Sequence, residues 1–219
     1  MEWREGDGVR WLEACLPGAT AAFPTRSAGS LKDGHARLAG ALGLSPEQIP
    51  SSRQVHGVEL VFHDGPGAAP DEADGHVVRA PGVAPLVYTA DCLPVALAGP
   101  EGAAILHCGW RGLAAGIVAR GVDAVGAGSA AIGPGIGPCC YEVGDEVLSA
   151  FTGLGGGIAS GRMLDLPEVA SRLLCQAGVG KVEAAGLCTS CERELFFSHR
   201  RDAGPGRQGG LVWLDAGRA

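Results

Sequence analysis

The chain has 219 residues, of which 46% are hydrophobic, so its length and composition suit one large domain or two small ones. Its 37 glycines and 14 prolines are scattered between apolar runs, which predicts many tight turns. A formal net charge of −7 and a pI near 5.3 leave no basic field to neutralise phosphates, so nucleic acid is excluded as a partner.

The sequence also lacks the features of membrane and secreted proteins. No apolar run approaches the roughly 18 residues that a membrane span needs, so we expect no membrane partner. Residues 1–7 are largely charged, and no apolar signal-peptide segment follows them. We therefore expect the eight cysteines to be free thiols in a cytoplasmic protein.

The first half of the chain is predicted to be rich in strands. Residues 1–30 are predicted to be irregular, with a strand leading into a loop at residues 23–30. A helix is predicted over residues 31–44, where apolar side chains recur on one stripe and Ser30 is the candidate cap. Short apolar runs then predict strands at residues 58–62, 74–78, 85–89, 94–98 and 103–106. Their short connections favour antiparallel or mixed pairing.

Helices and strands alternate in the second half. Helices are predicted over residues 112–124, 144–151 and 165–177, and strands at residues 130–132, 182–187 and 211–214. Asp165 caps the third of these helices, with Glu168 three residues later and Pro167 in the first turn. No internal repeat or break in composition appears. We predict one α/β domain of the α+β type over residues 1–219, with a mixed, largely antiparallel sheet flanked by helices.

Three residues with the side chains of metal ligands lie beside apolar runs, namely His56, Cys92 and His107. Imidazole and thiolate together suit zinc or copper, and a catalytic zinc keeps three protein ligands and one open position. A Cys92–His107 pair for nucleophilic catalysis is an alternative, and so is simple packing. Asp91 is a candidate to orient a histidine or a substrate hydroxyl, or to cap a turn.

The segment after His107 is a candidate anion site. Trp110 and Arg111 open the predicted helix, where free backbone N–H groups and a guanidinium attract phosphate. Trp110 is a candidate floor for a ring-shaped substrate, although an indole in the core is equally common. The glycine-rich residues 133–138 lack the spacing of dinucleotide and triphosphate loops, so we predict a rigid turn in a pocket wall instead.

Cysteines also recur late in the chain, where Cys188 and Cys191 form a Cys-x2-Cys pair. A structural zinc needs a second pair nearby. The adjacent residues Cys139 and Cys140 match poorly by spacing, so the sequence does not favour zinc here. Residues 196–202 combine aromatic side chains with paired arginines, which either approach a substrate or form a solvated edge.

Five motifs, in the same order over most of the chain, resemble those of the multicopper polyphenol oxidase (laccase-domain) family. Bacterial and animal members of that family are described as purine nucleoside phosphorylases. The motifs are Gln54-Val55-His56-Gly57, Thr89-Ala90-Asp91-Cys92-Leu93-Pro94, His107-Cys108-Gly109-Trp110-Arg111-Gly112, Ile132-Gly133-Pro134-Gly135-Ile136-Gly137-Pro138 and the tail from Phe196 to Leu214. Two departures from the family are a shortened segment after Arg26 and a second thiol at Cys108.

The resemblance implies a laccase-domain fold like that of cytotoxic necrotising factor. It also implies that His56, Cys92 and His107 are the catalytic residues and hold a metal, usually zinc, with copper as the alternative. The implied reaction is phosphorolysis of adenosine, inosine, guanosine or methylthioadenosine to the free base and the (methylthio)ribose 1-phosphate, with adenosine deamination as a second activity. We expect phosphate and substrate at Arg26, Asp91, Trp110 and Arg111.

Other activities remain open. One is a Cys–His hydrolase that edits a UDP-muramoyl-amino-acid precursor. A second is a copper-dependent polyphenol oxidase, which the six histidines of the chain disfavour because a true laccase holds several coppers. A third is a metal-binding module without catalysis. The sequence predicts no oligomeric state.

Overall fold

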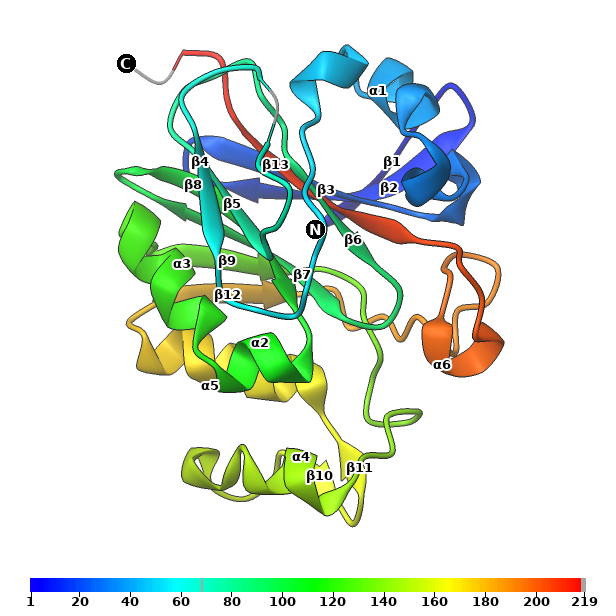
Figure 1. Ribbon diagram of the computed structural model, residues 1–219, viewed down its shortest axis with the longest axis vertical. Coiled ribbons are helices and arrows are strands. Elements are labelled where there is room, and N and C mark those ends of the chain that lie inside the picture. Colours follow the sequence, from blue (N-terminus) through cyan, green and yellow to red (C-terminus); the bar gives the residue numbers. More distant parts are fainter. Residues whose placement is uncertain (68, 218–219) are drawn as a thin grey trace.

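The computed structural model describes residues 1–67 and 69–217, and two β-sheets form its centre (Figure 1). The five-stranded sheet is antiparallel and has the order β1 (Glu2–Gly6), β2 (Val9–Leu16), β3 (Ala19–Pro24), β13 (Gln208–Leu214), β6 (Leu86–Thr89). The six-stranded sheet has the order β12 (Lys181–Ala184), β9 (Ser129–Ile132), β7 (Leu93–Gly99), β8 (Gly102–Cys108), β5 (Gly75–Val78), β4 (Leu60–His63). It is mixed, because the pairs β12–β9 and β4–β5 are parallel.

The remaining elements are short. The α-helices are α1 (Ala36–Ala41), α2 (Trp110–Ala114), α3 (Ile117–Val125), α4 (Asp145–Ser149), α5 (Leu166–Gln176) and α6 (His199–Asp202). The 3-10 turns are η1 (Arg26–Ala28), η2 (Leu31–Asp33), η3 (Pro46–Gln48) and η4 (Thr152–Leu154), and β10 (Ala159–Ser160) pairs with β11 (Met163–Leu164). No helix among the described residues is both long enough and apolar enough to cross a membrane.

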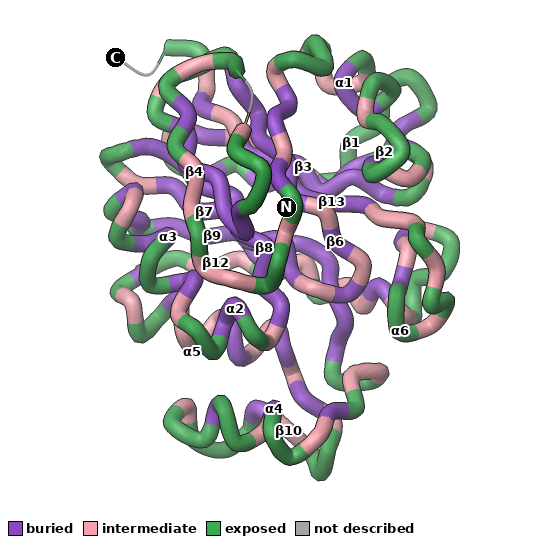
Figure 2. The backbone as a smooth tube through the Cα atoms, viewed as in Figure 1, coloured by how far each residue is buried: buried purple, intermediate pink, exposed green. Residues whose placement is uncertain are grey.

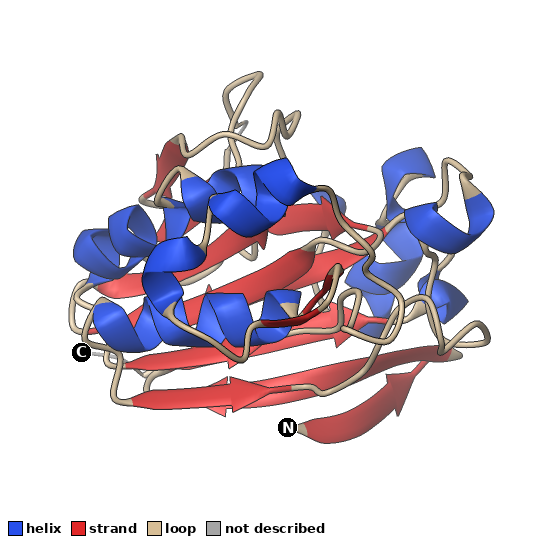
Figure 3. Ribbon diagram, turned by 90° about the horizontal axis from the view of Figure 1, so that it is seen from below, coloured by secondary structure: helices blue, strands red, loops and turns tan. Residues whose placement is uncertain are grey.

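The two sheets pack face to face, with helices on the outside (Figure 3). Side chains alternate between the faces of each strand. On β7, Val95 and Leu97 pack with α3 and α5, whereas Ala96 and Ala98 face the other sheet. The other face of the five-stranded sheet packs on α1. The order of layers is therefore α1, five-stranded sheet, six-stranded sheet, then α2, α3 and α5, and the buried residues follow the strands (Figure 2).

Small residues let the sheets approach closely. The inner face of the six-stranded sheet carries several alanines, and Gly210 on β13 faces β7. A Cβ atom added to Gly210 would lie 2.6 Å from Cβ of Pro94, so a side chain at this position would push the sheets apart.

The predicted fold class is confirmed, but the expectation for the amino terminus was wrong. Residues predicted to be irregular form β1, β2 and most of β3. Asp7 and Gly8 both have positive φ, 51° and 69°, as in the two-residue turn that joins a β-hairpin. The start of β3 was missed because its alanines give a weak hydrophobic pattern.

Two predicted helices were also too long. The helix expected over residues 112–124 is broken into α2 and α3 at Gly116, whose φ is +93°. The helix expected over residues 31–44 is reduced to η2 and α1. By contrast, the predicted cap of α5 is confirmed, because the Asp165 side chain accepts a hydrogen bond from the backbone N of Glu168 at 3.0 Å.

Candidate functional site

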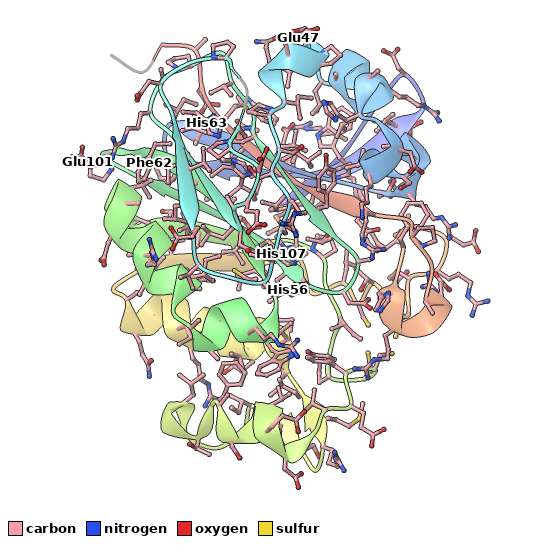
Figure 4. All side chains as sticks on the ribbon, in the orientation of Figure 1. Glu47, His56, Phe62, His63, Glu101 and His107 are labelled. Atoms are coloured by element: carbon pink, nitrogen blue, oxygen red, sulfur yellow. The ribbon has the colours of Figure 1, made fainter. Side chains whose placement is uncertain are left out.

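The antiparallel pairing of β7 with β8 brings Cys92 and His107 together. Leu93 lies opposite Cys108 and Pro94 lies opposite His107, so the start of β7 and the end of β8 share one edge. His56, on the loop before β4, completes the group. Its Nε2 lies 3.9 Å from Sγ of Cys92, and the two imidazole rings are 4.9 Å apart in an edge-on arrangement. Figure 4 shows both histidines next to each other at one end of the sheet.

A buried carboxylate that the sequence did not reveal holds this group in place. Asp74, immediately before β5, has no exposed surface. Its Oδ1 accepts hydrogen bonds from Nδ1 of His107 at 2.8 Å and from the backbone N of His56 at 2.9 Å. Its Oδ2 accepts from the backbone N of Val55 and of Gly57. These bonds hold His56 in a left-handed conformation, with φ of 60°.

The ionisable groups Asp74, His107 and Cys92 change one another's pKa values. Burial would raise the pKa of Asp74, but hydrogen bonds from His107 and from the backbone lower it to about 2. Burial would lower the pKa of His107, but Cys92 and then Asp74 raise it to about 9. Burial would raise the pKa of Cys92, but the charge and hydrogen bonds of the two histidines lower it to about 6. At neutral pH the metal-free group is therefore a thiolate beside an imidazolium.

This donor set fits a single metal ion. One ligand atom from each of His56, Cys92 and His107 lies within 4.8 Å of the others. Because Asp74 takes Nδ1 of His107, Nε2 is the nitrogen left for a metal, which is the usual carboxylate–histidine–metal arrangement. Two imidazoles and a thiolate suit zinc with one open position, and they also suit copper.

Gly109 and Cys108 follow His107 in the chain, and only Gly109 lies against the candidate metal ligands. A Cβ atom added to Gly109 would come 3.0 Å from both Sγ of Cys92 and Cδ2 of His56, so only glycine fits without crowding the ligands. Cys108, considered above as a second thiol at the site, is fully buried on the opposite face of β8 and packs in the core. Burial raises its pKa. Cys108 is thus a core residue.

The three residues open into a cavity of about 860 Å³, a size that suits a small-molecule ligand. Apart from the thiolate of Cys92 and the imidazolium of His107, five of its lining residues are cationic and one is anionic. The cations are Lys32, Arg53, Arg111, Arg200 and Arg207, and the anion is Asp91. The cavity is therefore basic although the whole chain is acidic. This charge favours an anionic ligand.

The residues predicted to bind substrate are only partly brought together. Trp110 and Arg111 line the cavity, with the Arg111 guanidinium 4.5 Å from the indole centroid. Within the described part of the chain, this guanidinium has no hydrogen-bond or ion-pair partner. The helix that they open is only five residues long, which weakens the predicted helix-end contribution. Arg26 does not line the cavity; its Nη1 donates to the backbone O of Arg193, and its guanidinium lies over Phe197.

Asp91 lines the cavity, but hydrogen bonds within the protein occupy both of its carboxylate oxygens. Oδ1 accepts from Oγ1 of Thr189 at 2.7 Å, and Oδ2 accepts from the backbone N of Arg200 at 2.7 Å. The φ of Asp91 is 93°, so these bonds support an unusual conformation next to Cys92. Asp91 links the site to the carboxy-terminal loops, and no sequence signal pointed to Thr189 as its partner.

The sequence spacing predicted that Cys139 and Cys140 match the pair Cys188 and Cys191 poorly as metal ligands. This prediction was wrong, because the fold brings the two pairs together. Sγ atoms of Cys139, Cys140, Cys188 and Cys191 all lie within 4.8 Å of one another. This thiol cluster is separate from the cavity, whose lining includes none of the four residues.

Known proteins resemble this chain over most of its length. The family model described as multi-copper polyphenol oxidoreductase laccase matches residues 27–215. A Deinococcus radiodurans protein named purine nucleoside phosphorylase is 41% identical over 199 residues, 84% of this chain and 76% of that protein. The Escherichia coli protein named purine nucleoside phosphorylase YfiH is 36% identical over 188 residues, 80% of this chain and 77% of that protein.

Solved structures agree in fold. YlmD from Geobacillus stearothermophilus superposes with a TM-score of 0.82 at 29% identity, covering 98% of both chains. Protein NMB0706 from Neisseria meningitidis superposes with a TM-score of 0.79 at 30% identity, covering 94% of this chain and 99% of that one. By sequence and by fold, the chain belongs to the multi-copper polyphenol oxidoreductase laccase family.

Proposed function

We propose that the protein is a purine nucleoside phosphorylase that acts on adenosine, inosine, guanosine or methylthioadenosine. The observation that carries the proposal is the group His56, Cys92 and His107 at a cavity with five lining cations and one carboxylate. A phosphorolytic site must attract orthophosphate to an uncharged nucleoside, which this charge distribution favours. The names of relatives 36–41% identical to this chain support the same reaction.

Arg111 and Lys32 are the best-placed residues for phosphate in this proposal. Both line the cavity, and within the described residues neither side chain has a hydrogen-bond or ion-pair partner. Arg53 is paired with Glu72, and Arg207 donates to the backbone O of Gly204 and Gly206, so these two cations are already engaged. A free guanidinium is the side chain best suited to bidentate binding of a phosphate.

Trp110 and Tyr141 supply aromatic surface for the base in the same cavity. Burial, and next the charge of Cys92, raise the pKa of Tyr141 to about 12. Its hydroxyl therefore stays protonated and can donate a hydrogen bond to the purine. This matters because orthophosphate oxygen bonds to C1′ as the C1′–N9 bond breaks, and the bonding electron pair moves onto the base.

The metal expected at His56, Cys92 and His107 would supply Lewis-acid polarisation of an oxygen atom, with zinc preferred over copper. Asp74 fixes the tautomer and orientation of His107, and Gly109 leaves space for the ligands. Adenosine deamination at the same site is included in the proposal as a second activity. The eight free thiols are consistent with the proposed cytoplasmic location.

A thiol hydrolase is the second candidate, because Cys92 and His107 form a thiolate–imidazolium pair when no metal is bound. Hydrolysis of a UDP-muramoyl-amino-acid precursor belongs to this alternative. A multicopper oxidase has less support, since only one group of three or more possible ligands among the described residues combines imidazole with thiolate.

The test is release of free base from each nucleoside by zinc-replete protein, with and without orthophosphate. The proposal predicts release that rises with phosphate concentration and is lost in His56→Ala. Cys15→Ser, which changes an exposed residue on β2 outside the cavity lining, is the matched control. Phosphate-independent release would indicate a hydrolase, and release of an amino acid from a muramoyl precursor would favour the thiol mechanism.

A further inference from the structure

The thiol cluster of Cys139, Cys140, Cys188 and Cys191 arises from the sheet topology. β9 and β12 are parallel neighbours, with Ile132 opposite Ala184, so both strands end at the same edge. The loops that follow them start side by side. One carries Cys139 and Cys140, and the other carries Cys188 and Cys191.

Backbone hydrogen bonds keep these two loops in register. Gly135 forms a bridge with Cys188, and the backbone N of Thr189 donates to the O of Gly135 at 3.0 Å. The backbone N of Gly137 donates to Sγ of Cys188 at 3.3 Å, the kind of N–H to sulfur bond that supports a metal thiolate. The thiols are thus presented by an ordered framework.

The spacing of the sulfur atoms fits four ligands around one ion. Sγ of Cys191 lies 3.4 Å from Sγ of Cys139 and 3.5 Å from Sγ of Cys140, and all four atoms lie within 4.8 Å of one another. A tetrahedral zinc with bonds of about 2.3 Å separates its sulfur ligands by about 3.8 Å. The cysteines are free, and a disulfide needs sulfur atoms about 2.05 Å apart.

The surroundings place one guanidinium, that of Arg201, beside such a site, and this guanidinium also pairs with Asp202. Four thiolates and one divalent ion carry a net charge of about −2. The guanidinium of Arg201 donates to the backbone O of Thr189 and of Ser190, between the two cysteines of the Cys-x2-Cys turn. The turn itself is closed by hydrogen bonds from the backbone N of Cys191 and of Glu192 to the O of Cys188.

We propose that Cys139, Cys140, Cys188 and Cys191 bind a second metal ion, a structural zinc, that joins the two loops behind the cavity wall. The loops carry functional neighbours, because Thr189 holds Asp91 and the segment after Cys140 supplies Tyr141 to the cavity. Four thiolates with no open position make a closed site, which stabilises structure and does not bind substrate. The site would thus fix Asp91 and Tyr141 from outside the cavity.

Zinc content of the full-length chain tests this proposal without any substrate, so its outcome is independent of the proposed reaction. Protein purified under reducing conditions is reloaded with zinc, desalted and analysed for metal and protein. We expect two zinc ions per wild-type chain and one in Cys191→Ser. His56→Ala should also keep one, the double variant should keep none, and Cys175→Ser, at an exposed site on α5, should keep two.

Cobalt substitution identifies the ligands of the remaining ion. In His56→Ala loaded with cobalt, the proposal predicts strong sulfur-to-cobalt charge transfer and the visible bands of a tetrahedral ion, both lost when Cys191→Ser is added. One zinc per wild-type chain that disappears in His56→Ala would overturn the proposal. So would a second zinc that survives in both Cys191→Ser and Cys139→Ser, because it would lie elsewhere.

Discussion

The carboxylate of Asp74 accepts a hydrogen bond from Nδ1 of His107 at 2.8 Å, and both side chains are buried. The same carboxylate binds the backbone of the loop that presents His56. One side chain therefore orients two of the three candidate metal ligands. Burial would raise the pKa of Asp74, but the hydrogen bonds from His107 and from the backbone lower it to about 2, so the carboxylate is ionised in the folded protein near neutral pH.

Asp74→Asn should weaken metal binding, because an amide NH2 replaces one of two oxygen atoms that each accept two hydrogen bonds. The amide keeps one acceptor oxygen but loses the charge that supports His107, and removal of such a partner typically costs 10–100-fold in affinity, to order of magnitude about 1–3 kcal/mol. Competition with a chromogenic chelator measures the affinity. Asp64→Asn, at an exposed carboxylate, is the control. An unchanged affinity in Asp74→Asn would remove Asp74 from this role.

Cys92 should react as a thiolate in metal-free protein. Its alkylation rate should rise with a midpoint near pH 6, because His107 and His56 offset the effect of burial on its pKa. His107→Gln should move the midpoint upward, toward the value of about 8.5 for an ordinary thiol. Mass spectrometry of the peptides separates Cys92 from the exposed Cys175. A wild-type midpoint above pH 8 would rule out the thiolate–imidazolium pair.

Arg111→Gln should raise the KM for phosphate by roughly ten- to hundredfold, the equivalent of a hydrogen bond to a charged group. The nucleoside KM should change less. Arg120→Gln, which removes an exposed arginine of α3 outside the cavity lining, is the matched control. A larger effect from Arg26→Gln than from Arg111→Gln would instead place phosphate at Arg26, whose guanidinium lies over the ring of Phe197.

His76 should make the protein sensitive to acid. Burial, and next the charge of His63, lower its pKa from 6.5 to about 3, so between these values the unfolded chain binds a proton that the folded chain does not. The contribution of His76 to the free energy of unfolding is therefore fully present above pH 6.5 and is lost as the pH falls toward 3. Asp74 titrates in the folded state only near pH 2 and adds a further loss as the pH falls below its unfolded value of 3.8.

Replacing His76 with valine should flatten this decline. Between pH 6.5 and 4.5 the wild-type free energy of unfolding should fall by roughly 2–3 kcal/mol more than that of His76→Val. Urea unfolding at several pH values measures the difference. His35→Gln, outside the core, should follow the wild type. Parallel pH curves for wild type and His76→Val would contradict the prediction.

The parts of the site that lie on strands could be predicted from the sequence. Cys92 precedes one apolar run and His107 lies at the end of the next, and an antiparallel pair brings the start of one strand beside the end of the other. Asp74 could not be identified in this way. An aspartate at the start of a strand is usually a turn residue, and only contacts with Val55, His56, Gly57 and His107 show that it is a buried charge with partners.

The thiol cluster escaped prediction for a different reason. Cys140 and Cys188 are far apart in the chain, and the pairing of β9 with β12 that joins their loops is a property of the sheet order. The strand β3 was similarly hidden, because its alanines become core residues only where another sheet packs against them. Local sequence patterns predict the strands, whereas contacts between distant loops determine which residues come together as possible metal ligands.

The identity of the sugar product tests the central claim most directly. Zinc-replete protein is incubated with adenosine and orthophosphate, and phosphorus NMR follows the phosphate signal over time. We predict that ribose 1-phosphate forms in the same amount as free adenine, and that neither forms in His56→Ala. Adenine released together with free ribose, with no new phosphate ester, would contradict a phosphorylase and point to a hydrolase.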